Sequence, residues 1–183
     1  MGKGDKTGKD LGVCIVLECF VILIIQYSIF SNGGKMTTTR IQETKINSPA
    51  RAASSGAIAG LGGGLVFGMM MGMMGMLPMV GMLVRQENAF IGLIVHMFIS
   101  AVIGSIYGIA ASRLPSTYPV GVVAGAVNGV IWWILGALTM MPILLGMNQM
   151  VFVIGELQWL SLMGHIVFGV VTGLLFVPLS RRL

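Results

Sequence analysis

Charge is scarce in this chain, and acidic side chains are the scarcest of all. Its 183 residues include 6 Asp and Glu, 11 Lys and Arg and 2 His, so charged residues make up only 9% of the total. An ordinary soluble domain has about a quarter of its residues charged and places them on its surface. The shortage excludes that class of protein, and it leaves few carboxylates for acid–base chemistry.

Cysteines and the usual active-site motifs are also scarce. Cys14 and Cys19 are the only cysteines, and we interpret them as free thiols because they lie five residues apart in an apolar run. The chain has no paired carboxylates, no Ser, His and Asp set, no HExxH motif and no phosphate-binding loop after a strand. Its net charge of +5 is spread over tails and connections. These absences predict a protein that is not an enzyme and does not bind nucleic acid.

Apolar residues, glycine and methionine are abundant instead. Hydrophobic residues make up 56% of the chain, with 27 Gly and 16 Met. A helix of about 20 apolar residues is long enough to cross a bilayer. The sequence therefore predicts an all-α integral membrane protein with an N-terminal segment and four core segments, at residues 11–30, 54–83, 89–111, 119–147 and 157–178. We interpret residues 1–35 either as a tail with a transmembrane helix or as an extension upstream of a start at Met36, and residues 36–53 as a polar linker.

The basic residues predict how the core lies in the membrane. From Met36 onward, six of the seven basic residues fall on one side of the predicted spans: Arg40, Lys45, Arg51, Arg113, Arg181 and Arg182. Only Arg85 falls on the other side. Because an excess of Lys and Arg marks the cytoplasmic side, we expect the linker and the C-terminus to be cytoplasmic. The N-terminal segment departs from this rule, since spanning would place Lys3, Lys6 and Lys9 outside.

The core contains an internal repeat. Residues 54–111 and 119–178 read as two copies of one helical hairpin. The matching pairs are Gly56 and Gly121, Gly60 and Gly125, Gly64 and Gly129, Phe67 and Trp132, and His96 and His165. Two helices per copy return the chain to the same side, so we expect a pseudo-twofold axis along the membrane normal.

Glycine recurs every fourth residue along the first arm of each hairpin. Such a stripe leaves a groove into which another helix can pack with its backbone close by. Without water to bind, the backbone in lipid stays helical despite the glycines. We expect helix packing at Gly56, Gly60, Gly64, Gly68, Gly72, Gly121, Gly125 and Gly129.

His96 and His165 are the only histidines, and both lie within predicted spans. Ionisable residues inside a membrane are often functional. One interpretation is a paired ligand set for haem, another tetrapyrrole or a metal, because imidazole suits iron, copper and zinc. A small residue, Ser100 or Gly169, follows each histidine by one turn and clears space beside the ring. The other interpretation is a histidine that hydrogen-bonds a carbonyl or hydroxyl group of a facing helix.

Methionines gather toward the same end of the spans. Thioethers are soft ligands, so Met73, Met76, Met140 and Met141 form a candidate copper(I) site. The alternative is that methionine fills irregular helix contacts, for which its flexible side chain is well suited.

Two stretches, residues 73–78 and 164–173, and the histidine at position 96 (His96) are similar to those of a known group of proteins. In these the chain resembles small Gly- and Met-rich bacterial polytopic membrane proteins of unassigned function, which implies a four-helix core and no known activity. We expect a non-enzymatic subunit in the lipid bilayer of a bacterial cytoplasmic membrane, or of an internal photosynthetic or respiratory membrane. It would pack against other membrane-protein subunits or its own copies. The alternative is a small oligomeric transporter or channel for a metal ion or an apolar solute.

Overall fold

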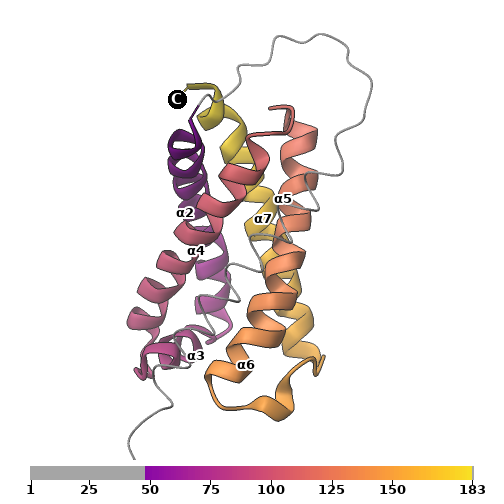
Figure 1. Cartoon of the computed structure of the whole chain (residues 1–183). Coiled ribbons are helices and arrows are strands. Elements are labelled where there is room, and N and C mark those ends of the chain that lie inside the picture. The colour runs from indigo at the N-terminus through magenta and orange to yellow at the C-terminus, as the bar shows by residue number, and fades with distance from the viewer. Residues whose placement is uncertain (1–47, 183) are drawn as a thin grey trace, which may run out of the picture. The chain divides into compact units, whose positions relative to one another are not determined.

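The computed structural model describes residues 48–182, shown in colour in Figure 1. The predicted N-terminal segment, Cys14, Cys19 and most of the linker lie outside these residues. Every element in the described range is helical, and four stretches are long and apolar enough to span a membrane: Pro49–Met73, Ala89–Ala111, Tyr118–Leu144 and Glu156–Arg182. The described residues are therefore all-α, and their four apolar spans make the chain an integral membrane protein, as predicted.

The first hairpin is shorter in its first arm than the sequence suggested. Helix α2 (Pro49–Met73) ends ten residues before the expected boundary of the segment 54–83. Gly75 takes a left-handed conformation with φ of +68°, and the Met76 N–H donates to the Met71 carbonyl at 2.9 Å. A left-handed residue followed by such a hydrogen bond is typical of the C-terminal end of a helix. Glycine adopts the left-handed conformation without strain. A continuous helix over 54–83 was therefore a wrong prediction.

After this turn the chain folds back through two short helices. Helix α3 (Leu77–Gly81) and the 3-10 turn η1 (Met82–Val84) lead to helix α4 (Ala89–Ala111). The Asn88 side chain caps α4, since its Oδ1 accepts from the N–H groups of Phe90 and Ile91 at 2.8 and 3.2 Å. Helix α4 has the bounds that the sequence predicted.

The second hairpin has a longer first arm in three parts. Helix α5 (Tyr118–Trp132) continues into the π-helix η2 (Trp133–Met140) and the short helix α6 (Met141–Leu144). In the wider π turn, the Thr139 hydroxyl donates to the Ile134 carbonyl at 2.8 Å. The arm ends at Gly146, where φ is +73°. The 3-10 turn η3 (Asn148–Met150) then leads to helix α7 (Glu156–Arg182).

The contacts between the four long helices give the order α4, α2, α7, α5. Helix α2 packs against both α4 and α7, and α7 packs against α5, whereas α4 and α5 have little contact. An exact twofold relation between the hairpins would pair α4 with α5 as closely as α2 with α7. The packing between the halves is therefore uneven.

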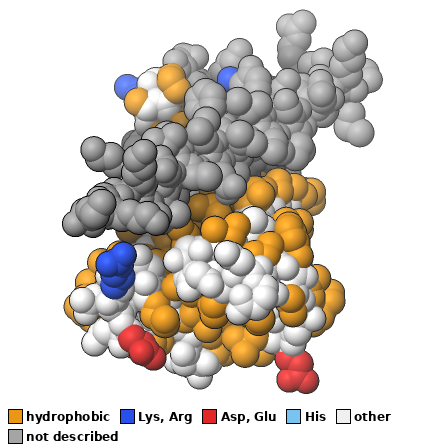
Figure 2. Space-filling model, turned by 60° about the horizontal axis from the view of Figure 1, so that its bottom comes forward, with side chains coloured by type: hydrophobic (Ala, Val, Ile, Leu, Met, Phe, Trp, Pro, Cys, Tyr) orange, Lys and Arg blue, Asp and Glu red, His pale blue; other side chains and the backbone are white. Residues whose placement is uncertain are grey.

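The bundle has two ends, the Arg113 end and the Arg85 end, each named after an arginine that lies there. The Arg113 end is where α2 and α5 begin and α4 and α7 end. The Arg85 end holds the connection between α2 and α4 and the connection between α6 and α7. Figure 2 brings the Arg85 end forward, and its surface is largely apolar or uncharged.

Candidate functional site

Glycine brings α2 and α4 into backbone contact. A methyl group added at Gly60 would lie 2.7 Å from the Gly104 Cα, and one added at Gly56 would lie 2.8 Å from the Gly108 Cα. Real Cβ atoms essentially never come closer than 3.0 Å to such an atom. At Gly64 the neighbour is the Ser100 side chain, whose Cβ would lie 2.5 Å from the added carbon. Three of the five predicted packing glycines of α2 are therefore occupied by the second arm of their own hairpin.

Helices α5 and α7 meet in the same way. A methyl carbon at Gly125 would lie 2.8 Å from the carbonyl carbon of Gly169, and one at Gly121 would lie 2.8 Å from the Gly173 oxygen. At Gly129 it would lie 2.8 Å from the carbonyl carbon of His165. These three glycines leave no room for a side chain.

The last two predicted glycines are different. A carbon added at Gly68 would meet only side chains, the Leu93 Cδ1 at 3.1 Å and the His96 Cδ2 at 3.2 Å. Gly72 is exposed and has only the Leu77 side chain nearby, at 3.5 Å. The close backbone packing of α2 against α4 therefore ends before the turn at Gly75, although Gly92 of α4 again meets the backbone of α3 beyond it.

Both histidines lie against one aromatic ring. Phe67 of α2 packs edge-on against His96 of α4, with ring centroids 5.3 Å apart and planes at 82°. It packs similarly against His165 of α7, with centroids 4.9 Å apart and planes at 63°. Gly164 of α7 makes room for the ring, because a side chain there would overlap Phe67. This three-ring cluster, consisting of Phe67, His96 and His165, joins helices α2, α4 and α7.

Each imidazole uses one nitrogen to bind a backbone carbonyl. The Nε2 of His96 lies 3.0 Å from the Gly64 oxygen on the facing helix. The Nδ1 of His165 lies 2.7 Å from the Ser161 oxygen in its own helix. A carbonyl only accepts, so these nitrogens carry the protons. In the neutral rings the lone pair then lies on Nδ1 of His96 and on Nε2 of His165.

These contacts bear on the two interpretations of the histidines. The bond from His96 to Gly64 is the helix-to-helix hydrogen bond of the second interpretation. For the first, a tetrapyrrole or metal ligated by both imidazoles has to compete with Phe67 for the space beside both rings. Among residues 48–182, no group of three or more His, Cys, Asp or Glu residues could hold a metal ion. A shared cofactor at His96 and His165 stays a prediction.

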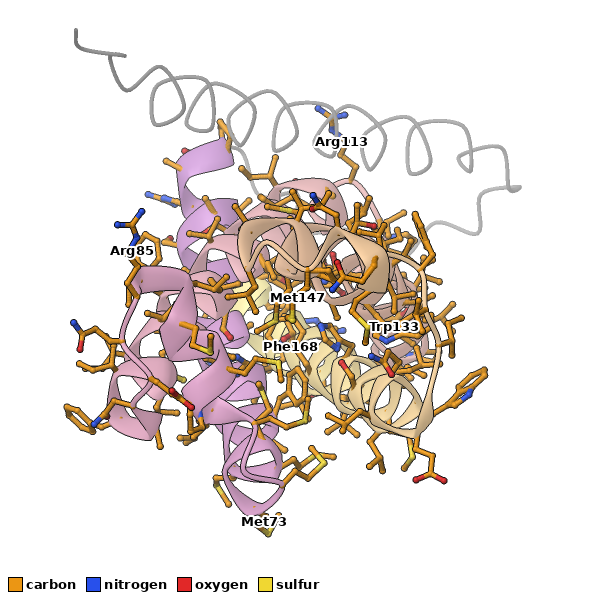
Figure 3. All side chains as sticks on the ribbon, turned by 90° about the horizontal axis from the view of Figure 1, so that it is seen from below. Met73, Arg85, Arg113, Trp133, Met147 and Phe168 are labelled. Atoms are coloured by element: carbon orange, nitrogen blue, oxygen red, sulfur yellow. The ribbon has the colours of Figure 1, made fainter. Side chains whose placement is uncertain are left out.

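The four candidate methionines do not share one environment. Met73 is 81% exposed and points away from the bundle (Figure 3), whereas Met76, Met140 and Met141 are half-buried. Seen from the Arg85 end, Met147 lies near the centre of the bundle, close in projection to Phe168. A copper(I) site needs several sulfur atoms that converge on one point. The outward direction of Met73 makes it unsuited to such a site inside the bundle.

Sequence reasoning missed Tyr107, which links the two hairpins. This residue of α4 is 1% exposed, and its hydroxyl donates to the Gly121 carbonyl of α5 at 3.2 Å. Its ring packs edge-on against Phe176 of α7 at 5.5 Å. A polar aromatic residue on the glycine face of a predicted span was the available signal, because a buried tyrosine needs a partner for its hydroxyl.

At the other end, Trp133 joins the two arms of the second hairpin. Its indole N–H donates to the Gln158 carbonyl at 3.0 Å, and its ring stacks on Trp159 at 6.4 Å. Together these contacts fix the beginning of α7 against the π-helix.

Comparison of the chain with protein-family models, with curated proteins and with solved structures gives no match.

Proposed function

We propose that the chain is a non-enzymatic structural subunit of a membrane assembly, and that it offers the outer face of α4 to a helix of another subunit or of a second copy. The observation that carries this proposal is the low coverage of α4. Of the most apolar 18 residues of α4, only 28% are buried. The corresponding share is 39% for the α5–α6 span and 44% for both α2 and α7.

The uncovered face of α4 is a continuous stripe of large apolar side chains. Phe90, Ile94, Phe98 and Val102 recur every fourth residue and are all exposed, with Phe98 reaching 71%. Residues at this spacing lie on one face of a helix. Aromatic side chains dominate the energetics of many interfaces, so the stripe suits a partner helix as well as lipid.

The polar side chains inside the spans support a structural role. His96, His165, Tyr107 and Trp133 each donate to a backbone carbonyl. The bonds of His96, Tyr107 and Trp133 join different helices, whereas that of His165 lies within α7, and all four satisfy donors that lipid cannot bind. They provide no paired acid and base and no activated nucleophile.

The predicted transport alternative is not favoured by these contacts. A path through one chain requires space between helices, but α2 contacts α4, and α5 contacts α7, through backbone atoms. Transport would then need a path between the two hairpins or between several copies of the chain.

We also infer that the two hairpins arose by duplication. In the predicted alignment, the pair Gly60 and Gly104 matches the pair Gly125 and Gly173. A methyl carbon added at Gly60 would lie 2.7 Å from the Gly104 Cα, and one added at Gly125 would lie 3.3 Å from the Gly173 Cα. The pair Gly64 and Ser100 matches Gly129 and Gly169, which also face each other. At these glycine positions the two hairpins make similar contacts, which supports the duplication.

Site-specific photo-crosslinking in native membranes tests the proposed docking face. A photoreactive residue at Phe98 should give a discrete protein adduct, whose mass identifies a second copy or another subunit. The matched control is Val123 of α5, which is 63% exposed but lies outside the stripe. Adducts with lipid alone at Phe98, as at Val123, would contradict the proposal.

A further inference from the structure

The charged residues of the described part divide sharply between its two ends. Arg51, Arg113, Arg181 and Arg182 all lie at the Arg113 end, and all four are exposed. The Arg85 end carries one arginine with two acidic residues, Glu87 and Glu156. Within residues 48–182, the Arg113 end therefore has four positive charges and no acidic side chain.

Arg181 is held in place at this end. Its Nη2 donates to the Ser116 carbonyl in the connection between α4 and α5. Its guanidinium carbon lies 5.9 Å from the centroid of the Tyr118 ring, a distance suited to a cation–π contact. These contacts orient the side chain and use part of its donor capacity. A guanidinium has five N–H donors, so others remain for an anion.

Tyr118 places this arginine at a membrane interface. The tyrosine is half exposed and begins helix α5, where the apolar span starts. Tyrosine is enriched at the level of the lipid headgroups because its ring is apolar and its hydroxyl is polar. The guanidinium beside it is then level with the headgroup phosphates.

We propose that the Arg113 end binds the phosphates of anionic phospholipids in the adjoining leaflet, and that Arg181 is its best-oriented contact. Arginine matches phosphate geometry because its planar group donates two parallel hydrogen bonds. Arg182, Arg51 and Arg113 add positive charge around it. The partner is the bilayer itself, so this surface is separate from the outer face of α4.

Lipid binding to the purified full chain tests the proposal, with melting temperature and bound-lipid count by native mass spectrometry as readouts. Phosphatidylglycerol should bind in preference to phosphatidylcholine and should raise the melting temperature more. Arg181→Gln should weaken phosphatidylglycerol binding about fivefold, because each basic residue near an anionic surface contributes a factor of about that size to the affinity. Adding Arg182→Gln should weaken the binding further. The control Arg85→Gln should leave binding unchanged.

Equal binding of the two lipids would overturn the proposal, as would equal losses from Arg85→Gln and Arg181→Gln. Inorganic phosphate that raises the melting temperature as much as phosphatidylglycerol would also count against a lipid partner. If Arg181→Gln fails to fold, Arg181→Lys and Arg182→Gln replace it. Lysine keeps the positive charge but cannot donate the two parallel hydrogen bonds of a guanidinium. A partial loss of phosphatidylglycerol binding therefore supports the proposal, and unchanged binding in both variants refutes it.

Discussion

A methyl group added at Gly60 should separate α2 from α4. In Gly60→Ala the new carbon would begin 2.7 Å from the Gly104 Cα, whereas ordinary contact starts at 3.4 Å. The two backbones must therefore move apart by at least about 0.7 Å, since neither atom belongs to a flexible side chain. Such overpacking typically costs about 1–3 kcal/mol, and alanine's better helix propensity recovers at most about 1 kcal/mol. We expect a net loss of stability.

The matched control is Gly136→Ala in the π-helix. A carbon added there has nothing within 4 Å, so only the propensity and chain-entropy terms remain. This variant should be as stable as the wild type or more stable, by up to about 1 kcal/mol. Reversible unfolding in mixed micelles, followed by tryptophan fluorescence, gives the free energy of unfolding of all three proteins. Equal stability of the two variants would show that backbone contact at Gly60 does not hold the hairpin together.

Other variants test the interior and the three-ring cluster. Phe67→Ala should cost about 3–5 kcal/mol of unfolding free energy by the same assay, whereas Phe98→Ala on the exposed face should cost much less; similar costs would contradict the role of the cluster. Thr172→Val should melt at the same or a higher temperature, because the fully buried Thr172 hydroxyl has no hydrogen-bond partner, and a lower melting temperature would refute this. Tyr107→Phe should lose about 0.5–1.5 kcal/mol with the hydrogen bond to Gly121, and an unchanged unfolding free energy would show that this bond does not stabilise the packing of the hairpins.

Hydropathy and local signals predicted the features that depend on neighbouring residues. The bounds of α4 follow from the polar residues around it, with Asn88 as the cap. The close packing at Gly56 and Gly121 follows from the four-residue spacing of glycine in an apolar segment, because lipid favours close helix contacts through small residues. No knowledge of the third dimension was required for these inferences.

Other features depend on backbone conformation that apolar patterns do not encode. Residues on both sides of Gly75 are apolar, so hydropathy gives no sign of the left-handed turn that ends α2. The π-helix at Trp133–Met140 is equally hidden, since its residues are those of an ordinary span. The three-ring cluster was not predictable because it requires α2 and α7 to be neighbours, and two membrane spans, α4 and the α5–α6 arm, separate Phe67 from His165 along the chain.

The two hairpins differ at a position where α2 and α7 meet. Gly63 lets α7 approach α2, because a methyl group there would lie 2.6 Å from the Phe168 oxygen. The matching position in α5 is Asn128, which is fully buried and has a side chain. The repeat is therefore not exact at this contact. The two hairpins join mainly between α2 and α7, and α4 is the least buried of the four spans.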